Sequence, residues 1–154
     1  MPKRRDLVSM SDSEMWDFIE SRKSIQVATL NKDGSPHLTT LWFAVQDGKI
    51  VLETFTKSQK IVNLQRDPRI ALLLETGESY DQLRGVSINA TAELVSDVDE
   101  VHRLHTSVLV RNQPEVPEDV LDKVSAGMAH KKTAILVEPS KVMSWDHTKL
   151  GGIY

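Results

Sequence analysis

The chain has 154 residues, a length typical of one domain with a single hydrophobic core. Its 19 lysines and arginines against 22 aspartates and glutamates give a net charge of −3, which argues against nucleic acid as the main partner. The absence of cysteine excludes disulfides, thiol catalysis and cysteine-ligated metals. The N-terminus is basic without an apolar run behind it, and no stretch has the roughly 20 apolar residues of a membrane span. We therefore expect a soluble, cytoplasmic protein with an N-terminal tail, 1–10, and one domain, 11–154.

The first part of the domain is typical of a helix followed by antiparallel strands. Ser11 and Glu14 form an S-x-x-E capping box ahead of a helix through about residue 21. The β-branched run IQVATL, the turn signal at Asp33 and Gly34, and the run HLTTLWFAV predict a hairpin. After a second turn, QDGK, the run IVLETFT predicts another strand, so that these strands together resemble a meander.

A short helix and two apolar strands are expected next. KSQKIVNLQRD predicts a helix with Ile61 and Leu64 facing inward, and Pro68 ends it. RIALLLE is apolar along nearly its whole length, which is typical of a buried strand. In GVSINATAELVS the apolar residues alternate with polar ones, which predicts a long strand with one buried face.

The last third of the chain predicts two helices and a final strand. Asp97 or Asp99 is placed to cap a helix through about Val110, and residues 118–129 are typical of a second helix. KKTAILVEPSKVMSW predicts a last strand that is interrupted near Pro139. With about six strands, early hairpins and few crossover helices, the sequence favours a mainly β fold, an antiparallel Greek-key barrel with helices packed outside it.

Familiar catalytic and nucleotide-binding motifs are absent from the sequence. It contains no G-x-S-x-G elbow, no P-loop and no G-x-G-x-x-G, so hydrolase-elbow, Walker and Rossmann sites have no support. His102 and His105 have the spacing of a metal-binding pair on a helix, but no third ligand has a recognisable spacing. We interpret these histidines as part of a solvated helix face and expect no metal site.

The start of the helix after IVLETFT is the clearest candidate for ligand binding. Lys57 and Lys60 bracket Ser58 there, and the first backbone N–H groups of a helix are unpaired and favour anions. A serine hydroxyl and one or two ammonium groups would complete a phosphate cradle. The competing interpretation is a solvated helix start with Ser58 as its N-cap. On an earlier strand, Thr39 and Thr40 cannot both face the core, so that one of them is free to line a pocket.

The order of these segments resembles the pyridoxamine 5′-phosphate oxidase-like, flavin-binding split-barrel superfamily over about residues 11–145. The resemblance lies in ATLNKDGSPHLTTLWFAVQDGKIVLETFTKSQKIVNLQRDPRIALLLE and LRGVSINATAELV, and K-x-x-N-L-x-x-D-P-R at residues 60–69 is its most specific part. Within the superfamily the sequence is more similar to the actinobacterial flavin/deazaflavin oxidoreductases, many of which use coenzyme F420. The ending SWDHTKLG also resembles some members of that branch.

The resemblance implies a six-stranded split β-barrel that forms a homodimer, with two cofactors in grooves between the subunits. The implied cofactor is F420, with FMN as the alternative, and its phosphate or phosphate-bearing tail is held by the S-x-K residues Ser58 and Lys60. The cofactor-binding residues that the resemblance implies are Pro36, His37, Thr39, Thr40, Trp42, Thr54, Lys57, Ser58, Lys60, Asn63, Trp145 and Lys149.

Departures from the pyridoxine phosphate oxidases argue against vitamin B6 oxidation. The strand HLTTLWF has only His37 where those enzymes have a basic pair, and no arginine follows Arg111 to bind the substrate. Gly85 stands where they have glutamine, which is compatible with a longer deazaflavin cofactor. We therefore expect an F420-dependent reductase that transfers a hydride to a small organic acceptor. The alternatives are an FMN-dependent oxidoreductase of the same fold and a non-catalytic F420- or flavin-binding protein. The proton donor stays open between His37, Tyr80 and His147.

Overall fold

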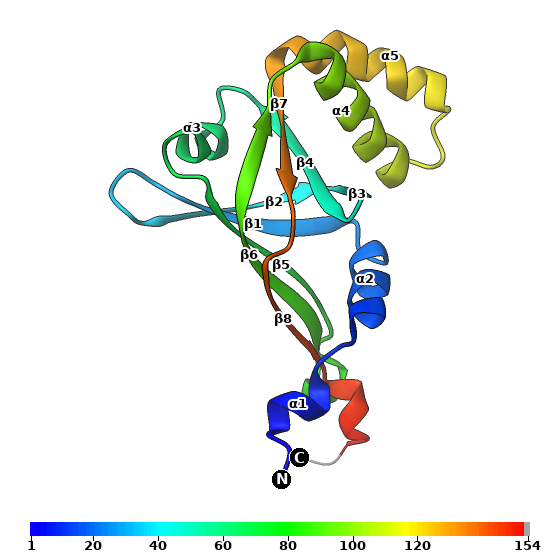
Figure 1. Cartoon of the computed structure of the whole chain (residues 1–154). Helices are drawn as coiled ribbons and strands as arrows, with labels where there is room; N and C mark the ends of the chain where they lie inside the picture. Colours follow the sequence, from blue (N-terminus) through cyan, green and yellow to red (C-terminus); the bar gives the residue numbers. More distant parts are fainter. Residues whose placement is uncertain (153–154) are drawn as a thin grey trace.

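The structure, a computed structural model that describes residues 1–152, is organised around one long strand (Figure 1). This strand, β6 (Arg84–Val95), pairs along one edge with β5 (Arg69–Thr76). Along its other edge it pairs first with β8 (Lys141–Asp146) and then with β7 (Lys132–Val137). All these pairs are antiparallel. Because β6 belongs to both halves of the sheet, the sheet curls into the expected split barrel.

The two halves of the sheet extend in opposite directions from β6. One half runs through β5 and β1 (Ser24–Leu30) to β2 (Pro36–Trp42). The other half runs through β7 and β4 (Lys49–Phe55) to β3 (Ala44–Gln46). Among the described strands β2 is hydrogen-bonded to β1 alone, so β2 is an edge strand.

The predicted meander is wrong in its second half. The hairpin of β1 and β2 forms as predicted, but β4 pairs with β3 and β7 and does not pair with β2. The run HLTTLWFAV, predicted as one strand, breaks at Phe43, whose side chain is fully buried. The turn of Phe43 into the core sends the chain from one half of the sheet to the other. The last predicted strand divides around Pro139, and the strands in the described chain number eight.

The N-terminal helices flank the part of the sheet that is at the bottom of Figure 1. α2 (Asp12–Glu20) begins at the predicted capping box, in which the Glu14 N–H donates to Ser11 Oγ and the Ser11 N–H donates to the Glu14 carboxylate. The stretch predicted as a tail contains a short helix, α1 (Arg4–Val8), which contacts the 3-10 helix η3 (His147–Leu150). Both ends of the described chain therefore lie close together (Figure 1).

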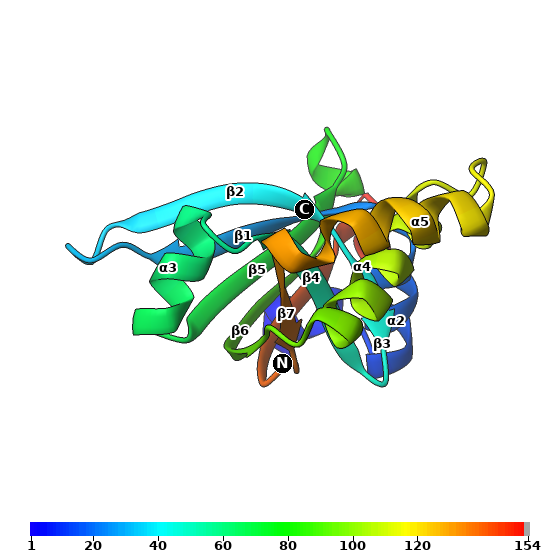
Figure 2. The ribbon, with the colours of Figure 1, turned by 90° about the horizontal axis from the view of Figure 1, so that it is seen from above.

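The remaining helices lie on either side of β4 and β7 (Figure 2). α3 (Gln59–Arg66) packs against β1 and β6, whereas α4 (Val98–Asn112) packs against β4 and β7 and is covered by α5 (Glu118–Met128). Two further 3-10 helices, η1 (Tyr80–Gln82) and η2 (Ala129–Lys131), precede β6 and β7. No helix of the described chain is both long and apolar enough to cross a membrane.

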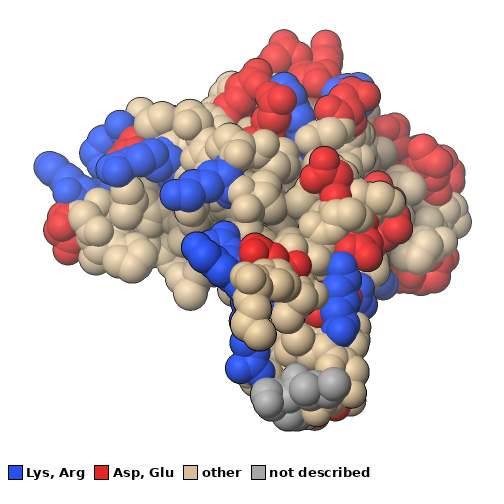
Figure 3. Space-filling view, turned by 60° about the horizontal axis from the view of Figure 1, so that its bottom comes forward, with Lys and Arg blue, Asp and Glu red and all other residues tan. Residues whose placement is uncertain are grey.

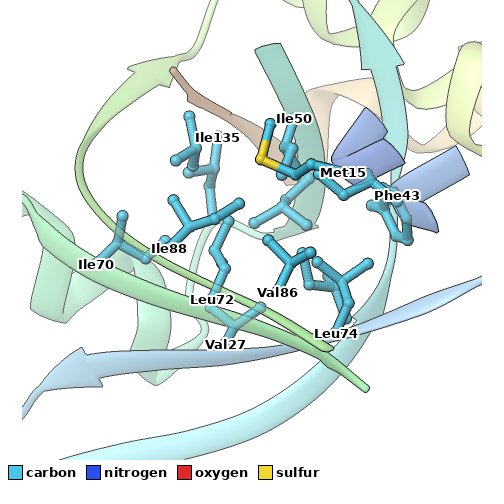
Figure 4. Packing of buried hydrophobic residues seen from close by; sticks show 14 of the residues in the cluster. Met15, Val27, Phe43, Ile50, Ile70, Leu72, Leu74, Val86, Ile88 and Ile135 are labelled. Carbon is cyan, nitrogen blue, oxygen red and sulfur yellow. The ribbon is translucent and has the colours of Figure 1, made fainter. Parts of the chain in front are cut away.

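Two apolar clusters form the core. The larger cluster fills the inside of the curled sheet and includes Phe43, Ile88 and Ile135, all fully buried (Figure 4). The smaller cluster lies between α4 and the other face of β4 and β7. Alternate residues of β4 reach the two clusters, since Leu52 belongs to the first and Val51 to the second.

Candidate functional site

One buried asparagine fixes α3 to the sheet. The Asn63 side chain is fully buried, and its amide nitrogen donates to Thr29 Oγ1 (3.1 Å) and to Asn31 Oδ1 (3.0 Å). Its amide oxygen accepts hydrogen bonds from Gln59 Nε2 (2.8 Å) and from an Arg66 guanidinium nitrogen (3.2 Å). These bonds use both donors and both acceptor positions of the amide. Asn63 therefore positions α3, and its amide has no hydrogen-bonding position left for a ligand.

The first turn of α3 contains two polar groups that the protein does not satisfy. Ser58 is the N-cap residue, but its Oγ makes no capping bond and is buried without a hydrogen-bond partner. Lys60 is only 8% exposed, and no hydrogen bond or ion pair to its ammonium is formed within the described chain. Burial lowers the pKa of Lys60, because water solvates the charged form less well than in the unfolded chain. A solvated helix start would expose this lysine, whereas a bound anion would satisfy it.

The inner face of β2 contributes two more polar groups without a hydrogen-bond partner. The strand register places His37 beside Thr29, the residue that binds Asn63 of α3, and Thr39 lies on the same face two positions on. His37 Nδ1 and Thr39 Oγ1 are both buried and lack a hydrogen-bond partner. The unsatisfied groups of α3 and of β2 therefore lie on the same side of the sheet.

The other β2 residues of the predicted set face the outer side of the sheet. Pro36, Thr40 and Trp42 alternate with the inward residues, and all three are exposed. Trp42 is 45% exposed, so it is not a core residue. The Thr40 hydroxyl donates to the Ile25 carbonyl. Of the two neighbouring threonines considered from the sequence, Thr39 is therefore the one that faces inward.

Trp145 and Lys149 lie at the end of the sheet that is far from α3 (Figure 1). The Lys149 ammonium is 2.6 Å from the Glu14 carboxylate and donates to the Ser9 carbonyl (2.8 Å). Trp145 faces Gly85 in the β6–β8 ladder, and its indole occupies the space above that glycine. Within one chain, neither residue is brought to the first turn of α3.

Thr54 and Lys57 flank the end of β4. Thr54 is buried in the wall of the barrel, opposite Thr133 in the β4–β7 ladder. Lys57 is exposed and lines a pocket together with His130 and Lys131 of η2. The sequence did not indicate the last two residues, because they lie far from Lys57 along the chain and no local pattern connects them.

The predicted solvated histidine face of α4 is wrong for His105. This side chain is 2% exposed, with its Nε2 3.6 Å from a Glu53 carboxylate oxygen, and Glu53 is 2.7 Å from the Lys132 ammonium. Burial lowers the pKa of His105. His102 instead reaches the Asp122 carboxylate of α5 at 2.8 Å. No group of three histidines, aspartates or glutamates among the described residues could hold a metal ion.

Positive and negative side chains are unevenly distributed on the face of the molecule drawn in Figure 3. Lysine and arginine predominate on the left of that view, the side of the β1–β2 hairpin and α3, whereas aspartate and glutamate predominate on the right and at the top. On this face, the side of the β1–β2 hairpin and α3 is therefore more basic than the net charge of −3 for the whole chain suggests.

Comparisons with known proteins agree with this architecture. A family model described as pyridoxamine 5′-phosphate oxidase matches residues 11–146. The crystal structure of the conserved hypothetical protein Rv2991 from Mycobacterium tuberculosis is 42% identical, with a TM-score of 0.90 over 99% of this chain and 95% of that chain. No curated protein matches the chain.

More distant structures share the fold alone. An F420 reductase is 20% identical, with a TM-score of 0.64 over 82% of this chain and 93% of its own. The haem storage protein HutZ from Vibrio cholerae is 16% identical, with a TM-score of 0.65 over 86% of this chain and 94% of its own. The same architecture therefore occurs in a reductase and in a storage protein.

Proposed function

Because this chain belongs to the pyridoxamine 5′-phosphate oxidase family, we propose that it is an F420-dependent oxidoreductase that holds its cofactor at the first turn of α3. The observation that carries the proposal is the largely buried side chain of Lys60, whose ammonium has no partner in the described chain, beside the buried and unused Ser58 hydroxyl. A phosphate at this point would neutralise the Lys60 ammonium and accept hydrogen bonds from the hydroxyl and from the free N–H groups of the helix start. The residues present thus fit a phosphate-bearing cofactor.

In this proposal, different residues of the chain bind the cofactor phosphate, fix α3 and contact the ring system. Lys60 and Ser58 hold the phosphate of the cofactor, and Asn63 keeps them in place by fixing α3 to β1. His37 and Thr39 offer buried hydrogen-bonding groups from β2 to the ring system. When bound, reduced F420 supplies a hydride to an electron-poor double bond or quinone-like ring. The F420 reductase of the same fold supports this choice of cofactor.

Two other functions are favoured by particular observations. An FMN-dependent oxidoreductase is consistent with the family description, and an FMN phosphate would satisfy the same groups of α3. A non-catalytic binding protein is consistent with the shared fold of the haem storage protein HutZ. The three functions differ in cofactor preference and in turnover, so that binding and activity measurements separate them.

The test is a fluorescence titration of the purified protein with F420 and with FMN, in the wild type and in Lys60→Met. Methionine keeps an apolar stem of similar length and removes the charge, so we expect about 10- to 100-fold weaker F420 binding, as for loss of a charged hydrogen bond. Lys32→Met, an exposed lysine in the β1–β2 turn, is the matched control and should bind as the wild type does.

Each outcome of this titration has one meaning. Equal F420 affinity in Lys60→Met and wild type means that the first turn of α3 does not hold the phosphate. Tight FMN and weak F420 binding identifies an FMN-dependent protein. Tight F420 binding without turnover across a panel of quinone-like and activated alkene acceptors identifies a binding protein.

We further propose that the outer face of the sheet binds a second copy of the chain. A row of uncharged residues crosses this face from β2 to β8 in the strand register: Thr40, Gln26, Leu73, Ser87 and Met143. Leu38 beside the row is 68% exposed, and Trp42 and Met143 are 45% exposed each. Clustered exposed apolar residues of this kind mark interaction surfaces. A second copy is the partner that could also supply Trp145 and Lys149, which one chain alone keeps far from α3.

Light scattering tests this interface. The wild type should be a dimer at micromolar concentration, and Leu38→Glu should be a monomer because it places a charge in the apolar face. Val124→Glu on α5 is the matched control, since Val124 is 47% exposed on another surface, and this variant should remain a dimer. A monomeric wild type would exclude a site shared between subunits.

A further inference from the structure

The β1–β2 hairpin projects beyond the rest of the sheet, and α3 lies beside it (Figures 1 and 2). Within residues 1–152, the hydrogen bonds between α3 and this hairpin end on the last two residues of β1 and on the first residue of the turn that follows. Asn63 donates to Thr29 and to Asn31. The Arg66 guanidinium donates to the Leu30 carbonyl. None of these bonds reaches β2 directly.

Asn31 continues the connection from α3 to β2. Its side-chain Oδ1 accepts the bond from Asn63 (3.0 Å), and its Nδ2 donates to Ser35 Oγ (3.2 Å). The Asn31 N–H also donates to the Ser35 carbonyl, and the Asn31 carbonyl accepts from the Gly34 N–H, both at 2.9 Å. Ser35 directly precedes β2. The side-chain amide of Asn31 therefore bridges α3 and the start of β2.

This bridge joins the two walls of the candidate site. Ser58 and Lys60 belong to the first turn of α3, whereas His37 lies near the start of β2. In the described part of the chain β2 has ladder bonds on one side only, and the ends of such edge strands open more readily than the centre of a sheet. The end of β2 that carries His37 is therefore held by β1 and by the bonds of Asn31.

We propose that Asn31 is a positioning residue that fixes the spacing between the first turn of α3 and β2. For its consequence the inference rests on the proposed function. A ligand whose phosphate is held by Ser58 and Lys60 presents its ring system to His37 and Thr39 only while this spacing is kept. Without the bridge each wall retains its own polar groups, but the ligand has to order the two walls as it binds, which costs affinity.

The first test is hydrogen exchange of the free protein, which needs no ligand. Asn31→Leu removes both side-chain bonds and keeps a side chain of similar size. The protected amides at the start of β2 should then exchange about five- to tenfold faster than in the wild type. The amides of α3 should change by less than about twofold, because its bonds to Thr29 and Leu30 remain. Lys32→Leu, in the same turn and without a side-chain bond within residues 1–152, is the matched control and should exchange as the wild type does.

The second test is a fluorescence titration of the same variants with F420. Asn31→Leu should bind about tenfold more weakly than the wild type, and Lys32→Leu should bind equally well. Ser35→Ala removes the other end of the bridge and should also weaken binding. The double variant of Asn31→Leu and Ser35→Ala should be no weaker than Asn31→Leu alone, because both changes break one bridge. A variant that is merely less stable would lose amplitude in the titration and keep the wild-type Kd.

The two tests separate this inference from the proposed function. Faster exchange in β2 together with unchanged F420 affinity would show that Asn31 holds the hairpin without positioning the site, so that the inference is wrong while the proposed function stands. If the wild type binds neither F420 nor FMN, the proposed function fails and the exchange data alone decide. Unchanged exchange at the start of β2 in Asn31→Leu overturns the inference in either case.

Discussion

The Trp145 indole covers Gly85 so closely that a β-carbon on Gly85 would lie 2.2 Å from Cζ2 of Trp145. The two residues face each other across the β6–β8 ladder. The missing side chain at Gly85, compatible from the sequence with a longer cofactor, is thus explained by a contact within one chain.

Gly85→Ala should lower the free energy of unfolding by about 1–3 kcal/mol, because the indole has to move away from the ladder. Urea denaturation measures the loss, and a change in tryptophan fluorescence reports the displaced indole. Gly127→Ala in α5 is the control, since a β-carbon there meets no atom within 4 Å. Alanine should stabilise that helix by up to about 1 kcal/mol. Unchanged stability and fluorescence in Gly85→Ala would contradict the contact.

Asn63→Ala should lower the free energy of unfolding by about 2–4 kcal/mol. It removes an amide that makes four hydrogen bonds and leaves the buried Thr29 hydroxyl with one partner fewer. Gln65→Ala on the exposed side of α3 is the control and should change the stability by less than about 0.5 kcal/mol. If the two variants unfold at the same urea concentration, Asn63 does not anchor the helix.

Lys60→Met should make the free protein more stable by about 1 kcal/mol near neutral pH, although the proposed function predicts weaker cofactor binding in this variant. The pKa of Lys60 is lowered in the folded state by burial, so the unfolded state binds more protons between the two pKa values. The wild type should therefore gain stability as the pH rises through that window, and the variant should lack this gain. Urea titrations in neutral and alkaline buffers measure both effects. A less stable variant would show that the ammonium has a partner in the folded protein.

Acid should destabilise the protein through His105. Burial lowers the pKa of His105 below its ordinary value; the Lys132 and His102 charges act in the same direction, whereas Glu53 opposes them. The folded state thus disfavours the imidazolium, and stability should fall as the pH drops below about 6.5. His105→Gln should reduce the stability difference between about pH 7.5 and pH 5, measured by thermal unfolding. The exposed His130→Gln should keep that difference, and equal behaviour of the two variants would assign the acid sensitivity elsewhere.

Features that depend on neighbouring residues were predictable from the sequence. The capping box of Ser11 and Glu14 and the turn at Asp33 and Gly34 each lie within a few residues, and both form as predicted. The inward turn of Phe43 was not predictable, because it depends on which half of the sheet the next strand joins.

In the candidate site, too, the features set by neighbouring residues were predictable and those set by distant residues were not. The S-x-K pattern indicated Ser58 and Lys60, but the burial of Lys60 depends on how α3 docks on β1. The contact of Thr56 with Lys131 joins segments distant in the chain, so no local spacing indicates the pocket that Lys57 lines together with His130 and Lys131.

One wall of the candidate site is formed by the edge strand β2. β2 carries His37 and Thr39, yet in the described chain its ladder bonds go to β1 alone. Substitutions there disturb one ladder, whereas substitutions in β6 disturb both halves of the barrel. We therefore expect substitutions in β2 to alter the ligand preference of the candidate site while the pairing of β5, β6 and β7 stays unchanged.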